Sequence, residues 1–188
     1  MSPRRVALYG GSFDPPHVGH VLAIAYVLAA EPVDQVLLMP CYQHAFAKEL
    51  APFQDRLELC RAVAALFAPG RVQVSDLEAR LGGVSRTIDT VDALVSEDPE
   101  REIDLVLGTD LFAERAAWKS FDELERRCRF IVLARPGDPV PEGVAPSPPF
   151  PDVSSTDVRR RLRQGEPVAG LVPITVERLL RERGLYGT

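Results

Sequence analysis

The chain has 188 residues, a length that fits one compact domain able to bury its core without disulfide or metal support. Hydrophobic residues make up 46% of it and charged residues 26%, which is ordinary globular usage and excludes a disordered or fibrous protein. With 22 basic and 27 acidic residues the net charge is −5, which argues against bulk attraction to nucleic acid or an anionic membrane. Any anionic ligand must therefore be met by local groups.

The cysteines and the apolar runs bear on the compartment. Cys41, Cys60 and Cys128 are widely spaced and form no Cys-x-x-Cys pair, so we expect neither a disulfide framework nor a zinc site. A reducing cytoplasm fits this usage. The apolar run before Gly10 is four residues long, too short for a signal peptide, and the longest run, at 21–30, is half a membrane span.

Short aliphatic runs alternate with longer helical patterns, which is typical of a parallel sheet with crossover helices. The expected strands are residues 5–9, 35–39, 72–75, 104–107 and 129–134. The expected helices are residues 17–30, 53–67, 87–95, 111–127 with a break near Trp118, 155–164 and 173–183. We predict an α/β fold with a doubly wound, mostly parallel sheet and C-terminal helices, in one domain over residues 1–188. Ligands of such sheets bind beyond the carboxyl ends of the strands.

The loop after the first expected strand carries the clearest chemistry. The strand is expected to end at Tyr9, and GGSFDPPHVGH at 10–20 then runs into an apolar helix. Gly10 and Gly11 leave backbone amides open to a ligand, and the start of the helix aims its positive end at the same place, which favours phosphate binding. His17 and His20 share one face of the first helical turn and can donate to the oxyanions of phosphoryl or nucleotidyl transfer.

Plainer interpretations of this loop stay open. Gly-Gly and Pro-Pro are also ordinary turn residues, and two histidines at this spacing can ligate a metal ion. His44 is the remaining imidazole and no cysteine lies near in sequence, so a closed zinc site is not expected. The spacing also does not fit the GxGxxG dinucleotide pattern.

GGSFDPPHVGH resembles the phosphate-binding signature of the HxGH nucleotidyltransferases, and specifically that of the bacterial nicotinate-nucleotide adenylyltransferase family. Four later segments extend the resemblance over nearly the whole chain. They are SRTIDTVDAL at 85–94, LVLGTD at 105–110, VSSTDVR at 153–159 and LVPITVERLLRERGLYG at 171–187. The resemblance implies a Rossmann-like nucleotidyltransferase fold and adenylyl transfer to a pyridine mononucleotide.

The same resemblance implies roles for individual residues. His17 and His20 are the expected catalytic residues. The expected ATP-binding residues are Gly10, Gly11, Ser12, Phe13, Gly108, Asp110, Ser155, Thr156 and Arg159. The expected binding residues for the second substrate are Thr87, which faces the nicotinate ring, Trp118, which stacks on it, and His44, Lys48 and Arg135. No protein metal site is expected.

The segment VSSTDVRRRL also carries a signal of its own. Ser154 or Ser155 is a good N-cap, so a plain capped helix is one interpretation. Residues 157–183 hold seven basic and four acidic residues, which concentrates positive charge near a second helix start. Arg159, one turn from the cap, is the expected phosphate contact. For the other basic residues of this run a solvated face is expected; they are Arg160, Arg161 and Arg163.

Taken singly, three of the expected site residues have ordinary alternatives. Asp110 could cap the next helix, Trp118 could be core or half-buried surface, and Thr87 could be an N-cap or first-turn residue. The segment MPCYQHAFAKEL at 39–50 departs from the PPHK-like sequence common in the family, because four positions separate His44 from Lys48. Both side chains face the triphosphate if a helical turn forms there, and otherwise lie on a solvated loop.

We therefore predict a cytoplasmic enzyme of NAD biosynthesis that joins ATP and nicotinate mononucleotide into nicotinate adenine dinucleotide and pyrophosphate. Mg²⁺ is expected to arrive with ATP, since it commonly uses substrate phosphates and few carboxylates. Neither a nucleic-acid polymer nor a membrane is an expected partner, and the oligomeric state is left open. The alternatives are nicotinamide mononucleotide, phosphopantetheine or another phosphomonoester as acceptor, or a nucleotide-binding module without turnover.

Overall fold

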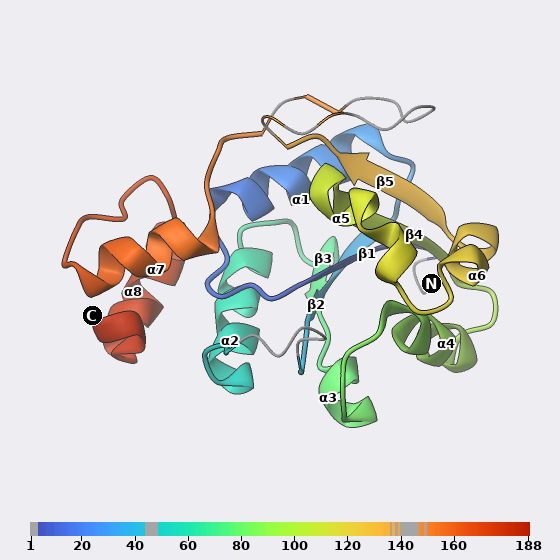
Figure 1. The fold of residues 1–188 in the computed structure, drawn as a ribbon, viewed down its shortest axis with the longest axis horizontal. Helices are drawn as coiled ribbons and strands as arrows, with labels where there is room; N and C mark the ends of the chain where they lie inside the picture. Colours follow the sequence, from blue (N-terminus) through green and yellow to red (C-terminus); the bar gives the residue numbers. More distant parts are fainter. Residues whose placement is uncertain (1–3, 44–48, 136, 138, 140–146, 149) are drawn as a thin grey trace.

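A computed structural model describes residues 4–43, 49–135, 137, 139, 147–148 and 150–188 (Figure 1). Its centre is a five-stranded sheet in which neighbouring strands are all parallel, in the order β3-β2-β1-β4-β5. The strands are β1 (Arg5–Gly11), β2 (Gln35–Pro40), β3 (Val72–Val74), β4 (Glu102–Gly108) and β5 (Arg129–Leu133). Because β1 and β4 are neighbours, the winding of the chain changes direction between them.

Helices cover both faces of this sheet, which confirms the predicted α/β, doubly wound architecture. The helical elements are α1 (Val18–Ala30), α2 (Phe53–Ala64), α3 (Leu77–Leu81), α4 (Thr87–Glu97), α5 (Thr109–Ala113), η1 (Arg115–Ala117), α6 (Phe121–Arg127), α7 (Ser155–Arg163), α8 (Ile174–Glu182) and η2 (Leu185–Gly187). None of these described helices has both the length and the apolar character needed to span a bilayer.

The alternation of side chains along each strand divides the core into two layers. In β2, Val36 and Leu38 point to the face covered by α1 and α2, while Leu37 and Met39 point to the face covered by α3, α4 and α6. All four are buried, as expected for a parallel strand that has helices on both sides. The continuous apolar run of this strand in the sequence is the signature of that double coverage.

The five expected strands are present, but β1 does not end at Tyr9. It continues to Gly11, with Gly10 opposite Met39 and Gly11 opposite Pro40 of β2. Pairing with β4 stops earlier, at Tyr9 opposite Val106. The two glycines thus extend the edge of the sheet instead of opening the loop.

The single helix expected at 111–127 is divided into α5, η1 and α6. The interruption includes the expected break near Trp118, whose backbone is extended, and Ser120, whose φ of 55° lies in the left-handed region. The five-residue helix α3 was not predicted, because it is shorter than two turns and leaves almost no periodic signal. The other expected helices are present with ends shifted by up to three residues.

Helices α7 and α8 lie together at one end of the molecule, next to α2 (Figure 1). Val176 and Leu180 of α8 are fully buried in the core layer of α1 and α2, and Leu179 is half-buried against it. Arg178 on the opposite side of α8 is exposed, so the helix has one apolar face and one solvated face. Helices α7 and α8 therefore pack into the same core layer as α1 and α2.

Replacing Leu180 by alanine should lower the free energy of unfolding by about 2 to 5 kcal/mol, because a large side chain with no exposed surface leaves a cavity. Ile174→Ala is the matched control on the same helix, since Ile174 is 77% exposed. Its effect should stay within about 0.5 kcal/mol. Urea denaturation of the two variants measures the difference, and equal effects would show that α8 is not packed as described.

Candidate functional site

The site expected from the sequence lies at the carboxyl ends of β1 and β4, where the strand order reverses. In a strand, the N–H and C=O of one residue point to the same side, and those of the next point to the other. The carbonyl of Gly11 accepts a hydrogen bond from Cys41 N at 2.9 Å, so Gly11 faces β2. Gly10 then faces β4, whose pairing with β1 runs to Tyr9 opposite Val106. Both glycines therefore belong to the paired edge of the sheet, and the loop that faces the crevice begins at Ser12.

His17 and His20 stand at the start of α1, with His17 as the N-cap and His20 in the first turn. Their ring centroids are 3.8 Å apart, and the backbone N–H of His17 donates to Nδ1 of His20 at 3.0 Å. A neutral His20 ring whose Nδ1 accepts a hydrogen bond carries its proton on Nε2. His20 can thus donate from Nε2 to an oxyanion while its orientation is fixed by the backbone of His17.

Gly19, the second of the two residues between the histidines, leaves room for the His17 ring. A Cβ at Gly19 would lie 3.0 Å from Cε1 and Nδ1 of the His17 ring, tighter than ordinary van der Waals contact. A side chain at this position would therefore displace the ring. The spacing of the motif depends on glycine here for packing, whereas its helical backbone would accept other residues.

Burial keeps both imidazoles neutral. Desolvation and, to a smaller extent, the nearby Arg135 guanidinium together lower the pKa of His17 to about 4. For His20, desolvation, the neighbouring His17 and Arg135 hold the pKa well below its usual value. His17 is 5% exposed, and its Nδ1 has no hydrogen-bond partner among the described residues. At neutral pH the pair therefore offers N–H donors without carrying positive charge.

Phe13 supports this pair from the side of the core. Its ring is 2% exposed and lies 5.0 Å from the ring of His20 and 5.6 Å from that of Tyr9. A Cβ at Gly11 would approach the Phe13 ring to 3.3 Å, so the second glycine makes room for it. The side chain expected to contact ATP is thus packed under the loop, and any contact of Phe13 with a ligand would run through its backbone.

The start of α7 docks on the loop between β1 and α1. The hydroxyl of Ser155 donates to the carbonyl of Pro15 at 2.9 Å, across 140 positions of sequence. The Arg159 guanidinium donates to the carbonyl of Asp14 at 2.6 Å and to Thr156 Oγ1 at 3.3 Å. Two helix N-termini, those of α1 and α7, therefore face one loop, and the side chains expected to bind phosphate come from both.

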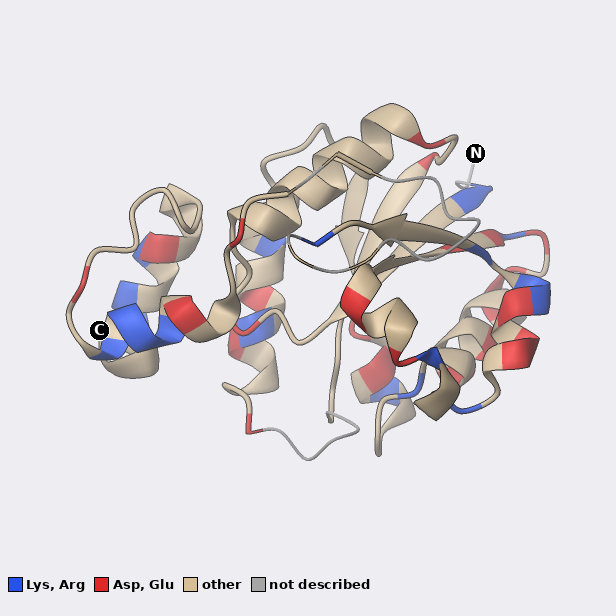
Figure 2. Cartoon of the chain, turned by 45° about the horizontal axis from the view of Figure 1, so that its top comes forward, with Lys and Arg blue, Asp and Glu red and all other residues tan. Residues whose placement is uncertain are grey.

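The capping question left open by the sequence is answered by Ser154, whose hydroxyl accepts from the backbone N–H of Asp157 at 3.1 Å. Figure 2 shows the basic residues gathered along α7. Arg160 and Arg161 both pair with Asp157, at 2.7 and 2.8 Å. These two arginines are thus partly neutralised within their own helix, whereas Arg159 alone of the three reaches the loop.

A second group of expected residues lies at the end of β4. Asp110 pairs with Arg135 at 2.9 Å, and the backbone N–H of Arg135 donates to Thr109 Oγ1 at 3.1 Å. A Cβ at Gly108 would collide with Asp110, so the glycine allows the carboxylate to fold back over the strand end. Asp110 is the second residue of α5 and does not cap it, since Gly108 occupies that position; the capping alternative is wrong.

Arg56 of α2 forms hydrogen bonds with both the loop after β1 and the loop after β2. It is 1% exposed, and its guanidinium donates to the carbonyls of Ala51, Ser12 and Cys41 at 2.8 to 3.0 Å. Within the part of the chain that the structure describes, no carboxylate lies within ion-pairing distance of it. A fixed positive charge therefore lies beneath the two strand ends at which a phosphate chain is expected.

Three residues of this centre were not singled out from the sequence: Asp14, Arg56 and Tyr186. Arg56 precedes Leu59, Cys60 and Val63 by three, four and seven positions, so it occupies the buried face of its helix, and that misplaced charge is a usable signal. Asp14 lies within the recognised motif. Tyr186 lies within the segment 171–187 that resembles the family, but its contact with Asp14 spans 172 positions and leaves no periodic signal.

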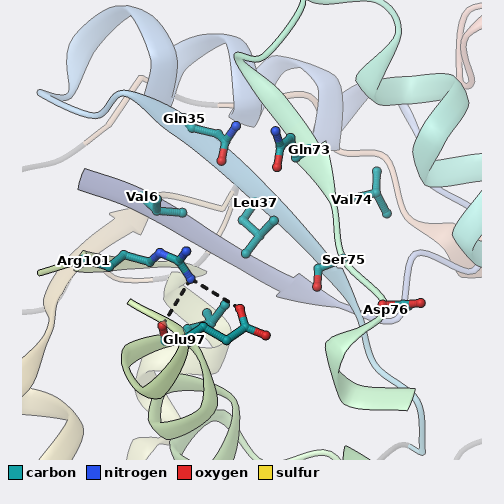
Figure 3. Close-up of a pocket in the computed structure, with 10 residues that line it drawn as sticks. Val6, Gln35, Leu37, Gln73, Val74, Ser75, Asp76, Glu97 and Arg101 are labelled. Carbon is teal, nitrogen blue, oxygen red and sulfur yellow. Dashed lines mark hydrogen bonds and ion pairs between the residues drawn. The ribbon is translucent and has the colours of Figure 1, made fainter. Parts of the chain in front are cut away.

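A cavity of about 270 Å³ elsewhere in the molecule does not coincide with this centre. It is lined by Val6, Gln35 and Leu37 of β1 and β2, by residues 73–76 in and after β3, and by Glu97 and Arg101 in and after α4 (Figure 3). Arg101 reaches Glu97 at 3.7 Å and donates to the carbonyl of Leu94 at 3.2 Å. None of its lining residues is an expected site residue, and none lies at the carboxyl end of β1 or β4.

Comparison with known proteins assigns the family. A family model described as cytidylyltransferase-like matches residues 8–161. A protein of Anaeromyxobacter dehalogenans named "probable nicotinate-nucleotide adenylyltransferase" is 43% identical over 186 residues, covering 97% of each chain. The protein of that name from Myxococcus xanthus is 42% identical over 183 residues, covering 97% of this chain and 95% of its own. The chain belongs to the nicotinate-nucleotide adenylyltransferase family.

Solved structures agree with this membership of the family. A putative nicotinate-nucleotide adenylyltransferase of Vibrio parahaemolyticus superposes with a TM-score of 0.77 at 26% identity, covering 98% of this chain and 96% of that one. The nicotinic acid mononucleotide adenylyltransferase of Plasmodium falciparum complexed with NaAD gives a TM-score of 0.84 at 19% identity, covering 97% of each chain. The second likeness establishes the fold, and the predicted nucleotidyltransferase fold is thereby confirmed.

The residues that the family resemblance assigns to the second substrate lie partly on the other face of the sheet. Thr87 is the first residue of α4, in agreement with the first-turn alternative. Trp118 is half-buried, and its ring meets that of Phe121 edge-on at 6.2 Å. Their role in binding stays a prediction. His44 and Lys48 lie outside the described residues.

The buried neutral histidines predict a pH dependence of stability. The unfolded chain takes up protons on His17 and His20 near pH 6.5, whereas the folded chain does not do so until the pH is much lower. The contribution of the two neutral histidines to the free energy of unfolding is therefore fully present above pH 6.5, and it is lost as the pH falls towards 4. For His17 alone the loss is at most about 3 kcal/mol.

Urea denaturation at pH 7.5, 6.0 and 5.0 measures this loss, with the double variant His17→Gln, His20→Gln as the control. The control retains the titrating carboxylates of the chain and lacks the two imidazoles, so its unfolding free energy should fall less steeply over the same range. Parallel curves for the two proteins would contradict the depressed pKa values.

Proposed function

We propose that the chain transfers the adenylyl group of ATP to nicotinate mononucleotide, giving nicotinate adenine dinucleotide and pyrophosphate. The observation that carries the proposal is the docking of α7 on the loop after β1, where Ser155 and Arg159 bind the carbonyls of Pro15 and Asp14 beside the histidine pair. The names of the relatives supply the substrates, and the geometry supplies a centre able to hold a triphosphate.

The reaction itself asks little covalent chemistry of the protein. An oxygen of the mononucleotide phosphate attacks the α-phosphorus of ATP, and a new P–O bond forms as the bond to the bridging oxygen of the β-phosphate breaks. Pyrophosphate leaves with that electron pair. Because the nucleophile is already an anion, no strong general base is needed, and catalysis rests on alignment and charge stabilisation.

The loop after β1 would hold the phosphate chain. The hydroxyl of Ser12 and Nε2–H of His20 would donate to it, and His17, whose ring centroid lies 3.8 Å from that of His20, would add a further donor. Preorganised neutral hydrogen-bond donors can stabilise the negative charge that develops on the phosphate oxygens in the transition state. The two histidines are thus proposed as the catalytic residues.

The remaining expected residues would receive the other parts of the substrates. Arg159, with Ser155 and Thr156 at the start of α7, would meet the β- and γ-phosphates and stabilise the leaving pyrophosphate. Gly108 and Asp110 would receive the adenosine at the end of β4, beside Arg135. The acceptor would lie towards Thr87 and Trp118, with His44 and Lys48 assigned to the same substrate by the family resemblance.

A divalent metal ion would enter with the nucleotide. Among the residues that the structure describes, no three His, Cys, Asp or Glu side chains are grouped so as to hold a metal ion. The phosphate oxygens of ATP are themselves preferred ligands of Mg²⁺, which keeps several waters. We therefore propose Mg²⁺ as part of the substrate, where it neutralises charge on the phosphates.

A pyrophosphate-release assay with ATP, Mg²⁺ and a panel of acceptors tests the function. Nicotinate mononucleotide should give the highest kcat/KM, nicotinamide mononucleotide a lower one, and phosphopantetheine no signal. Release with each pyridine nucleotide at equal efficiency would refute the acceptor assignment but not adenylyl transfer. ATP binding without release from any acceptor would show a nucleotide-binding module without turnover.

His17→Ala and His20→Ala should each lower kcat about 10²- to 10³-fold, the loss typical of one preorganised donor to a developing anion. Circular dichroism should show that both variants fold at pH 7.5. Ile174→Ala, an exposed position on α8, serves as the control and should retain wild-type turnover. A histidine variant that keeps more than half of the wild-type kcat would remove that residue from the mechanism.

A further inference from the structure

The C-terminal turn η2 reaches the phosphate loop directly. The hydroxyl of Tyr186 donates to Oδ1 of Asp14 at 2.5 Å, and the same oxygen accepts the backbone N–H of Ala51 at 3.1 Å. Asp14 is 2% exposed, so this carboxylate depends on protein donors for its stability. The turn η2 thus supplies one of the hydrogen bonds to the Asp14 carboxylate in the loop after β1.

Asp14 also holds Arg159. Its backbone carbonyl accepts from Nη1 of Arg159 at 2.6 Å, and its Oδ2 lies 3.4 Å from the same nitrogen. The position of this guanidinium therefore depends on where Asp14 stands. Arg159 thus contacts Asp14 at two atoms. Because the Tyr186 hydroxyl holds the other carboxylate oxygen of Asp14, it limits the movement of the residue that Arg159 binds.

Two guanidinium groups, those of Arg159 and Arg56, lie near the contact between Tyr186 and Asp14. The pKa of the Tyr186 hydroxyl is raised by burial and by its hydrogen bond to Asp14, and it is lowered by both Arg159 and Arg56, so the two guanidinium groups act on one buried spot. The Tyr186 hydroxyl donates a hydrogen bond to the carboxylate of Asp14 without adding charge, so the positive charge of Arg159 next to it is not reduced by this contact.

The backbone at both partners is held in a sparsely populated conformation. Phe13, next to Asp14, has a φ of 46°, and Tyr186 has a φ of 60°. Left-handed backbone at residues other than glycine costs free energy and persists where neighbouring contacts enforce it. The hydrogen bond of the Tyr186 hydroxyl to Asp14 is one contact that holds this conformation.

We propose that Tyr186 is a positioning residue for the triphosphate, acting through Asp14 on Arg159. This inference rests on the proposed function, because the task assigned to Arg159 is the binding of phosphate. Tyr186 does not touch the substrate. Its hydrogen bond keeps the Arg159 fork directed at the loop that carries the histidine pair.

The competing explanation is that Tyr186 only fastens the C-terminus to the core, where its side chain packs beside α7 and α8. Both explanations predict some loss of stability on mutation. They differ in a double-mutant cycle with Arg159. A residue that acts through Arg159 has nothing left to position once the guanidinium is gone, whereas a fastening residue has the same effect with or without it.

The experiment compares wild type, Tyr186→Phe, Arg159→Gln and the double variant. For each protein we would measure the Kd of ATP by calorimetry, and kcat and KM with ATP and nicotinate mononucleotide. Tyr26→Phe is the matched control, because it removes the same hydroxyl from α1, where the ring packs edge-on against Phe150 at 5.9 Å. Thermal unfolding of all five proteins gives the effect on stability.

Tyr186→Phe should lower kcat/KM for ATP about ten-fold and weaken ATP binding in the same direction, as expected for losing one hydrogen bond to a charged group. The KM of nicotinate mononucleotide should stay within about two-fold, and Tyr26→Phe should behave as wild type. The double variant should be no worse than Arg159→Gln alone.

Losses that multiply in the double variant would overturn the inference, as would a Tyr186→Phe variant with wild-type constants. If wild type binds ATP but transfers no adenylyl group, the proposed function fails while the cycle of Kd values still decides the role of Tyr186. If wild type does not bind ATP, both proposals fail.

Discussion

The contact between α7 and the loop after β1 is the interaction on which the site depends. The loop contributes the glycines and the histidines, and α7 contributes Ser155 and Arg159. The two segments are far apart in the sequence, so only their contact in the folded chain brings these groups together. Ser155 and Arg159 bind main-chain carbonyls of the loop, at Pro15 and Asp14. Such contacts fix the path of the backbone and do not depend on which side chains occupy those positions.

A second constraint is space around the imidazoles. Gly19 gives room to the His17 ring, Gly11 to the Phe13 ring, and Gly108 to the carboxylate of Asp110. Each glycine is needed for what lies beside it, not for an unusual backbone angle, since the φ values of all three are those that other residues adopt. The His17 and His20 rings lie 3.8 Å apart in a buried position, and desolvation lowers both pKa values so that both rings are neutral at neutral pH.

Much of the fold could be predicted from the sequence, because buried parallel strands read as continuous apolar runs such as that of β2. The five strands and the long helices followed from this. Boundaries were less certain where glycine continues a strand, as at Gly10 and Gly11, since glycine is the usual sign of a turn. The helix α3 was missed because five residues do not establish a period.

The site divides in the same way. Residues that lie within contiguous motifs, such as His17, His20 and Arg159, could be proposed from the letters and their spacing, and the structure brings them to one loop. The partners that hold these residues are scattered along the chain: Tyr186 is 172 positions from Asp14, and Arg56 is 44 from Ser12. No local pattern encodes such pairs, because they depend on how the helices pack. That the whole chain is one domain stays a prediction.

The burial of Arg56 has a consequence for the energetics of the site. Hydrogen bonds to three backbone carbonyls fix the position of its guanidinium. Its positive charge therefore creates an electric field at the strand ends before any ligand binds. In water, solvent molecules must reorient around a charge as it moves from one oxygen to another during a reaction. A field built into the folded chain makes that reorientation smaller, since the cost of orienting its dipoles was met during folding.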